Sequence, residues 1–268
     1  MELSENLVKR RNQSIEEDFD DLDSNCLTLT EEILLLGLKE REGFVSFWND
    51  SISLALRGCM LVDLELMGKI VMEPVSFKKK TFKARKVIVK DDGVIGNVIL
   101  DEALKHIKNA DPPENVEKWI TYLNGDTWNP IKLKYFIRNV RERLSKLLVE
   151  KGVLTMLKKN YLFFDMMLYP LLDEKVKASI VKKIQVSLTS GWSSDISGFK
   201  KSDLALCVLA SAGDVFENAL HSLSESDYDT AQARIELLTS MNFEKEDKRG
   251  LHTNSIMWAV FETMFNKL

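Results

Sequence analysis

Apolar residues recur along most of the chain at the three- and four-residue spacing of amphipathic helices. A first helix is predicted to begin at Thr28, because Thr28 and Glu31 form a T-x-x-E capping box before an apolar run that ends near Leu38. Residues 52–68 (ISLALRGCMLVDLELMG) are apolar all round, which is typical of a helix buried in a core, and Gly68 is placed to end it. The pattern therefore predicts a mainly α-helical, compact fold.

The longest clear helix is predicted at residues 131–151. One of its faces is apolar, while Lys134, Arg138 and Arg141 recur at i, i+4 and i+7 and form a short basic stripe on another face. The remaining helices are expected at 101–109, 114–123, 173–188, 202–222, 228–240 and 252–266, with a loop rich in serine and glycine at 187–200.

Two segments depart from the helical period and predict short β-hairpins. Residues 70–75 and 86–92 are β-branched runs on either side of a basic connection. The cations of this connection are Lys78, Lys79, Lys80, Lys83, Arg85 and Lys86. A second hairpin is predicted after Gly152, where VLTM and NYLFFDMML lead to Pro170.

The chain shows a weak internal repeat. Arg57 lies eleven residues before Gly68, Arg141 lies eleven residues before Gly152, and both glycines lead from a predicted helix into a predicted hairpin. A helix followed by a hairpin is typical of a winged-helix module. The fold could therefore contain winged-helix-like units, although helices that end in glycine are common.

Composition limits the classes of function. The 268 residues are 45% hydrophobic and carry a formal net charge of −4, so the chain lacks the positive field that drives sequence-independent nucleic-acid binding. Its three cysteines are widely spaced without a C-x-x-C pair, which predicts neither a disulfide framework nor a zinc site and indicates a reducing, cytosolic environment. The pattern predicts no signal peptide and no transmembrane helix, so any contact with a membrane would be peripheral.

The chain divides into an arm and a domain. Residues 1–26 are predicted to be a disordered arm, in which the basic cluster Lys9, Arg10 and Arg11 precedes an acidic run. Residues 27–268 are predicted to form a single helical domain.

No catalytic constellation is visible. The histidines His106, His221 and His252 are scattered, and the HExxH, GxSxG, GxGxxG and P-loop patterns are absent. We therefore expect a protein that is not an enzyme, without catalytic residues, a metal or a cofactor. The alternative hypothesis is a winged-helix-type nucleic-acid-binding protein that uses the basic connection. Against it, residues 58–68 carry two acids and no base, so we expect no nucleic-acid partner.

Trp48 and Arg57 are candidates for an anion site, because an indole supplies a flat apolar face and a guanidinium supplies a fork of donors that fits a phosphate. Simpler interpretations exist. Trp48 could be an ordinary core tryptophan, and Arg57 could form a salt bridge with Asp63 or Glu65. Likewise, Arg138 and Arg141 could pair with the nearby acids Glu142 and Glu150 on a solvated face.

Long motifs resemble the Golgi phosphoprotein 3 family. They include LTLTEEILLLGLKEREGFVSFWNDSISLALRGCMLVDLEL, the segment ILDEALKHIKNADPPENVEKWITYLNGDTWNPIKLKYFIRNVRERLSKLLVEKGVL, KKNYLFFDMMLYP, ALCVLASAGDVFENA and SIMWAVFETM. The resemblance runs from about residue 27 to the C-terminus. It implies a mostly helical, peripheral protein of the cytosol and of the cytoplasmic face of the trans-Golgi membrane. Such proteins bind phosphatidylinositol 4-phosphate and link the cytoplasmic tails of glycosyltransferases to the coatomer coat, which retains those enzymes in the Golgi during vesicle trafficking.

The resemblance also assigns residues. The headgroup pocket of the family corresponds to Trp48, Arg57, Arg138 and Arg141, and all four are present. The segment ENLVKRRNQ resembles the basic cluster that contacts coatomer, which implies that role for Lys9, Arg10 and Arg11. The predicted hairpin at 157–168 resembles the one through which the family self-associates, so a homo-oligomer is expected.

Two departures from the family pattern stand out. Met67 and Lys69 occupy positions where the family usually has basic residues, which is expected to thin the positive rim of the pocket. The segment Met167, Leu168 and Tyr169 replaces a threonine-threonine-histidine at the end of the hairpin. We expect this apolar segment to alter the oligomer or to add a contact with the membrane.

Overall fold

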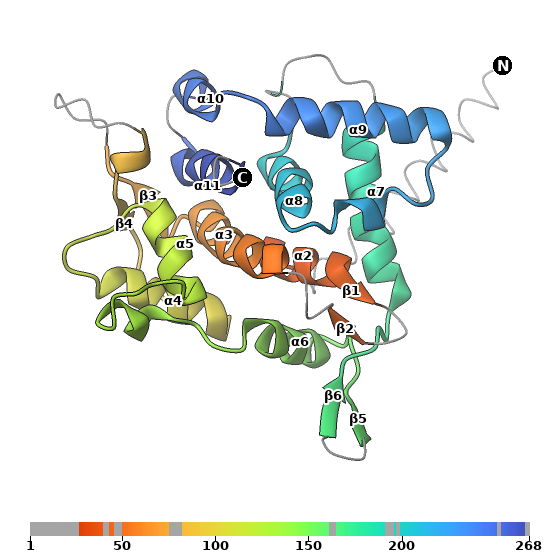
Figure 1. Ribbon diagram of the computed structural model, residues 1–268, viewed down its shortest axis with the longest axis horizontal. Coiled ribbons are helices and arrows are strands. Elements are labelled where there is room, and N and C mark those ends of the chain that lie inside the picture. Colours follow the sequence, from red (N-terminus) through yellow and green to blue (C-terminus); the bar gives the residue numbers. More distant parts are fainter. Residues whose placement is uncertain are drawn as a thin grey trace, which may run out of the picture.

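The structure is a computed structural model, and it describes residues 27–39, 43–45, 50–74, 82–160, 165–190, 196, 199–250 and 253–265. It is mainly α-helical, as the periodicity predicts (Figure 1). The α-helices are α2 (Leu29–Gly37), α3 (Asp50–Leu66), α4 (Val98–Lys108), α5 (Val116–Asn124), α6 (Val140–Glu150), α7 (Glu174–Thr189), α8 (Lys201–Ala212), α9 (Glu225–Thr239), α10 (Phe243–Arg249) and α11 (Ser255–Phe265). The short 3₁₀ helices are η2 (Phe82–Ala84), η3 (Lys132–Tyr135) and η5 (Phe216–Ala219).

Short antiparallel strand pairs connect some of these helices. They are β1 (Leu38–Lys39) with β2 (Phe44–Val45), β3 (Ile70–Met72) with β4 (Val87–Val89), and β5 (Leu157–Asn160) with β6 (Asp165–Leu168). The hairpins β3–β4 and β5–β6 confirm the sequence prediction, whereas β1 and β2 are too short to leave a period-two signal.

Helix α3 lies at the centre of the core and contacts α2, α4, α5, α8 and α11 (Figure 1). Nearly every side chain from Ala55 to Leu64 is buried, which confirms the all-round apolar pattern. Gly58 allows close packing against α11, because a Cβ atom there would lie 2.7 Å from Met264 Cε and 2.8 Å from Val260 Cγ1. Arg57, one of the candidate site residues, lies on this buried helix.

Two acids near the end of α3 cap neighbouring helices. Asp63 accepts hydrogen bonds from the amides of Leu29 and Thr30 and from the Thr30 hydroxyl at the start of α2. Glu65 accepts hydrogen bonds from the amides of Ile256 and Met257 at the start of α11. Each carboxylate satisfies helix N–H groups that have no partner within their own helix. The capping box of Thr28 and Glu31 also forms as predicted.

The two glycines of the internal repeat have the same role. Gly68 follows α3 with φ = +70°, and Gly152 follows α6 with φ = +73°. A left-handed residue after a helix is favoured as glycine because it has no Cβ atom. The local helix-glycine-hairpin unit is therefore present twice, while the proposed winged-helix homology stays a prediction.

The prediction of one helix over residues 131–151 was wrong. The chain forms η3, leaves helical geometry at Phe136, and begins α6 only after Asn139, which has φ = +53°. A tertiary contact causes the break, since Ile137 N donates to Leu123 O (3.2 Å) at the end of α5. Arg138 therefore lies in a turn and not on the same helix as Arg141.

The prediction of one helix over residues 202–222 was also wrong. Helix α8 ends at Ala212, and Asp214 adopts φ = +55° before η5 begins. Gly213 and Asp214 end the helix, because Val215 N donates back to Ala210 O (3.0 Å). In addition, the sequence pattern did not predict α10.

No helix among the described residues has both the length and the apolar character needed to cross a bilayer. This finding agrees with the sequence pattern, in which charged residues interrupt each apolar run.

We expect Glu65 to make stability dependent on pH. Burial raises the pKa of Glu65 to about 7, with the amides of Ile256 and Met257 acting in the opposite direction. Between its ordinary pKa and pH 7 the folded protein holds a proton that the unfolded chain has released, so stability falls as the pH rises. A Glu65→Gln variant lacks this titration. The free energy of unfolding is measured in urea for both proteins at pH 5 and pH 8. The value for the variant minus that for the wild type should be larger at pH 8 than at pH 5, by up to about 3 kcal/mol. An equal difference at both pH values would contradict this role of Glu65.

Candidate functional site

Arg57 is a buried cation that joins three segments of backbone. Its side chain is 5% exposed. Its Nη1 donates to Ser53 O (3.0 Å), its Nη2 to Ile137 O (3.2 Å) and its Nε to Leu123 O (3.4 Å). Leu123 lies at the end of α5, where carbonyl groups lack helical partners and a positive charge is favourable. Within the described part of the chain, these bonds engage three of the five guanidinium N–H donors.

Arg141 binds the same residue as Arg57 but comes from another helix. Arg141 lies in the first turn of α6, and its Nη2 donates to Ser53 Oγ (2.7 Å). The two guanidiniums therefore meet on Ser53, which contributes its backbone oxygen to one and its hydroxyl to the other. The structure thus brings together two cations that are more than eighty residues apart in the sequence.

The electrostatics of this pair favour an anion. The pKa of Arg57 is lowered to about 10, mainly by burial and in addition by the charge of Arg141, while Asp126 acts in the opposite direction. Burial also lowers the pKa of Arg141, against the influence of Asp50. Both groups remain charged at neutral pH, so two like charges lie close together in a partly buried place. An anion bound there would relieve this repulsion.

Arg138 lies beside the pair on an aromatic support. Its guanidinium carbon is 5.9 Å from the centroid of the Phe136 ring, and its side chain is exposed. The Phe136 ring in turn packs against Gly125, where a Cβ atom would lie 3.0 Å from the ring. Arg138 directly follows Ile137, whose carbonyl oxygen binds Arg57. Arg138 is therefore the sequence neighbour of a residue that Arg57 binds, in the segment between α5 and α6.

The start of α6 adds to the positive potential. The side chain of Asn139, at the N-cap position, makes no capping hydrogen bond. Amide groups in the first turn of a helix carry partial positive charge and favour an anion. The arrangement suits a phosphate, which can accept bidentate hydrogen bonds from guanidiniums.

The simpler interpretations of these arginines were wrong in part. Asp63 and Glu65 cap helices, and among the described residues Arg57 forms no ion pair with either. Glu142 pairs with Lys146 (2.7 Å), which lies one turn further along α6. Asp63, Glu65 and Glu142 therefore have partners other than these arginines.

Several predicted site residues lie outside the part of the chain that the structure describes. These are Trp48 of the pocket and Lys9, Arg10 and Arg11 of the arm. Their assignments remain predictions. Sequence reasoning missed Ser53 and Phe136, because a serine on a helix and a phenylalanine in an apolar run give no distinctive signal.

The departures from the family pattern have structural consequences. Lys69 pairs with Asp91 (2.6 Å), so its charge is already compensated, and Met67 is exposed. In the hairpin, Met167 is exposed but Tyr169 is buried, and its amide donates to Gly43 O (2.7 Å). Tyr169 therefore cannot serve as an outward apolar contact. Self-association through the hairpin stays a prediction.

The basic connection before β4 offers little free positive charge where it is described. Lys83 pairs with Glu262 (3.4 Å), Arg85 with Asp247 (3.5 Å) and Lys86 with Glu114 (3.8 Å). Lys78, Lys79 and Lys80 lie outside the described residues. The three described cations are thus engaged with acids of the same chain, which weakens the nucleic-acid hypothesis.

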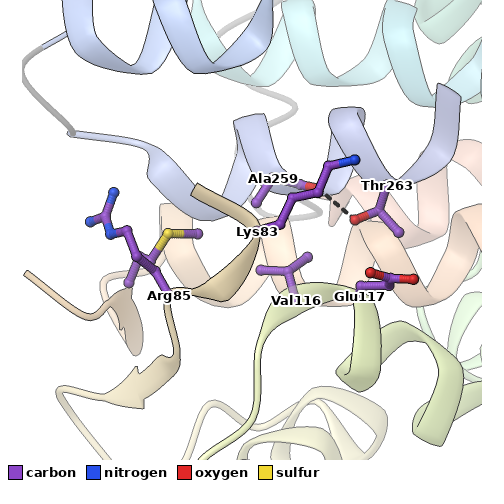
Figure 2. A pocket seen from close by; sticks show the side chains of 7 residues that line it. Lys83, Arg85, Val116, Glu117, Ala259 and Thr263 are labelled. Atoms are coloured by element: carbon purple, nitrogen blue, oxygen red, sulfur yellow. Dashed lines mark hydrogen bonds between the residues drawn. The ribbon is translucent and has the colours of Figure 1, made fainter. Parts of the chain in front are cut away.

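Lys83 and Arg85 line a narrow cavity of about 10 Å³, together with Met72, Val116, Glu117, Ala259 and Thr263. Figure 2 shows the charged end of Arg85 turned away from that of Lys83, and Thr263 bonded to the carbonyl of Ala259 (2.8 Å). A cavity of this size holds about one water molecule. It is too small for a headgroup or a nucleotide.

No group of three or more His, Cys, Asp or Glu side chains in the described part of the chain is arranged to hold a metal ion. Cys59 and Cys207 are buried, and burial raises the pKa of both thiols. A buried thiol of raised pKa is a poor nucleophile.

Comparison with known proteins places this geometry in a family. The model of the family Golgi phosphoprotein 3 (GPP34) matches residues 29–250, a range that contains the three arginines. Vacuolar protein sorting-associated protein 74 of Schizosaccharomyces pombe is 42% identical over 222 residues, which are 79% of this chain and 66% of the yeast protein. The match thus spans just under two thirds of that relative's length. These matches confirm the resemblance seen in the sequence motifs, and the chain belongs to the Golgi phosphoprotein 3 family.

Proposed function

We propose that this protein is a peripheral adaptor of the Golgi membrane that acts in vesicle trafficking and protein retention. The family and the name of the yeast relative, a protein associated with vacuolar protein sorting, support a role in membrane traffic. The adaptor binds phosphatidylinositol 4-phosphate with one part of its surface. Other parts of the protein bind the cytoplasmic tails of Golgi glycosyltransferases and coatomer, and so link the two.

The convergence of Arg57 and Arg141 on Ser53 carries the lipid-binding part of the proposal. A phosphomonoester has close to two negative charges and several acceptor oxygens. Arg138 and Arg141 are partly accessible and supply direct hydrogen bonds, while the buried Arg57 supplies charge from behind. Trp48 packs on the headgroup or on the interface beside it.

The protein-binding part uses other segments. Lys9, Arg10 and Arg11 of the N-terminal arm bind coatomer. The clients are cytoplasmic tails of glycosyltransferases.

Vesicle co-sedimentation tests the lipid-binding part. Three preparations are compared: phosphatidylcholine alone, phosphatidylcholine with phosphatidylinositol 4-phosphate, and phosphatidylcholine with enough phosphatidylinositol to match the total charge. We expect binding to the 4-phosphate vesicles to be at least about tenfold tighter than to either control, because each charge-assisted hydrogen bond contributes about 1.5–3 kcal/mol. Equal binding to both charged preparations would mean that the site recognises net charge and not the 4-phosphate.

A further inference from the structure

The segment between α5 and η3 exposes large apolar side chains. Trp128 has a relative exposure of 103%, and Ile131 has one of 70%. Leu133, in η3, is 45% exposed. A fully exposed tryptophan on an ordered loop is unusual, because its large apolar surface is normally covered. Residues 125–136, called the tip loop below, therefore present an apolar surface that needs a partner.

The tip loop is closed and ordered at its base. Ile137 N donates to Leu123 O (3.2 Å), and the Phe136 ring packs on Gly125. Arg57 binds the carbonyl oxygens of both Leu123 and Ile137. The same guanidinium that forms the back of the headgroup site thus holds the base of the tip loop.

Hydrogen bonds inside the tip loop also fix its shape. Ile131 N donates to Asn129 Oδ1 (3.0 Å), and Asn129 N donates to Thr127 Oγ1 (3.2 Å). Lys132 N donates to Asn129 O (3.0 Å). The apolar side chains therefore lie on a preorganised turn. When this turn binds a partner, it loses little additional conformational entropy.

The charges around the exposed side chains indicate the kind of partner. Residues 124–138 contain three cations and a single acid, Asp126. Lys132 pairs with Glu114 (3.1 Å), so the exposed Lys134 and Arg138 form the basic rim. An apolar tip with a basic rim is typical of a surface that enters the interface of an anionic bilayer, where tryptophan is also favoured. In Figure 1 the chain between α5 and α6 runs along the lower edge of the molecule, next to α4 and on the same side as α6.

We propose that Trp128 and Ile131 insert into the interfacial layer of an anionic membrane while the neighbouring arginines hold a lipid headgroup. This inference rests on the proposed lipid-binding function and adds a second contact with the same membrane. The two contacts act together because Arg57 joins the headgroup site to the base of the tip loop. Headgroup binding then orients the tip loop toward the bilayer.

The first test is vesicle binding by the full chain with Trp128→Ala and Ile131→Ala combined. On phosphatidylcholine vesicles that contain phosphatidylinositol 4-phosphate, we expect affinity to fall by about tenfold or more, since two large apolar side chains no longer leave water. Binding of soluble inositol 1,4-bisphosphate should be unchanged. Leu237→Ala is the matched control, because Leu237 is 46% exposed on α9 at the opposite edge of Figure 1.

The second test locates the indole. Tryptophan fluorescence is measured on vesicles whose lipids carry bromine on the acyl chains, for the wild type and for Trp128→Phe. The difference between the two proteins isolates Trp128 from the other tryptophans, and we expect strong quenching of this difference. Absence of quenching in wild type that is bound to the vesicles would overturn the insertion, and so would equal vesicle binding by the double variant.

The outcomes separate this inference from the proposed function. If wild type binds vesicles with and without the 4-phosphate equally but Trp128 is quenched, headgroup recognition fails and insertion stands. If binding depends on the 4-phosphate but Trp128 is not quenched, headgroup recognition stands and insertion fails. If wild type binds none of the vesicles, both fail.

Discussion

Replacement of Arg57 by alanine is expected to lower the free energy of unfolding by about 2–4 kcal/mol and to abolish headgroup binding. The side chain is buried and binds three carbonyl oxygens. Without it, the carbonyl of Ile137 loses its donor, the end of α5 loses a favourable charge, and a cavity remains. Urea unfolding and vesicle binding measure the two effects.

Arg57→Lys is the informative comparison. An ammonium group keeps the charge but cannot reach three acceptors in the fixed geometry of a guanidinium fork. We therefore expect lysine to recover only a minor part of the stability. A lysine variant as stable as the wild type would show that charge alone, and not the bridge between α5 and Ile137, is the structural contribution of Arg57.

The second large effect is expected for Arg138→Ala combined with Arg141→Ala. Both side chains are accessible enough to contact a ligand, and losing two charge-assisted contacts should weaken binding to phosphatidylinositol 4-phosphate vesicles by about a hundredfold or more. Stability should change by less than about 1 kcal/mol, because Arg138 is exposed and removal of Arg141 relieves repulsion on Arg57. The double variant is thus expected to lower lipid binding with little change in stability, whereas Arg57→Ala is expected to lower both.

The matched control removes two cations of α6 that lie outside the site. Arg143 and Lys146 lie on α6 and pair with Glu102 (2.6 Å) and Glu142 (2.7 Å). Arg143→Ala with Lys146→Ala changes the net charge by the same amount but leaves Ser53 and its two arginines intact. If this control weakened binding as much as the test variant, general electrostatic attraction would account for the affinity.

Local sequence signals predicted much of the fold. The capping box at Thr28, the buried pattern of α3 and the glycines after α3 and α6 all have the predicted role. Each depends on residues close together in the sequence, where hydrogen bonding and backbone preference act directly. Helix α3 in particular could be predicted because it is apolar on every side.

The break before α6 could not be predicted in this way. Residues 131–151 have a helical period, but the bond from Ile137 N to Leu123 O and the packing of Phe136 on Gly125 interrupt the helix. These contacts are between segments that the sequence does not show to be neighbours. Tertiary contacts of this kind outweigh the modest differences in helix propensity.

In the candidate site, too, the residue types could be predicted from the sequence, but their arrangement in space could not. The chemistry of Arg57, Arg138 and Arg141 is evident from residue type, and the family resemblance grouped them. The meeting of two guanidiniums on Ser53 is visible only in three dimensions. The same is true of the bonds from Arg57 to Leu123 and Ile137, which connect the proposed headgroup site to the base of the tip loop.

A crystal structure with inositol 1,4-bisphosphate, the soluble headgroup of phosphatidylinositol 4-phosphate, tests the central claim most directly. We predict that the 4-phosphate lies at the start of α6 and accepts hydrogen bonds from Arg138 and Arg141, with Arg57 behind it. A phosphate bound elsewhere, out of reach of Arg138 and Arg141, would contradict the claim that these arginines form the headgroup site.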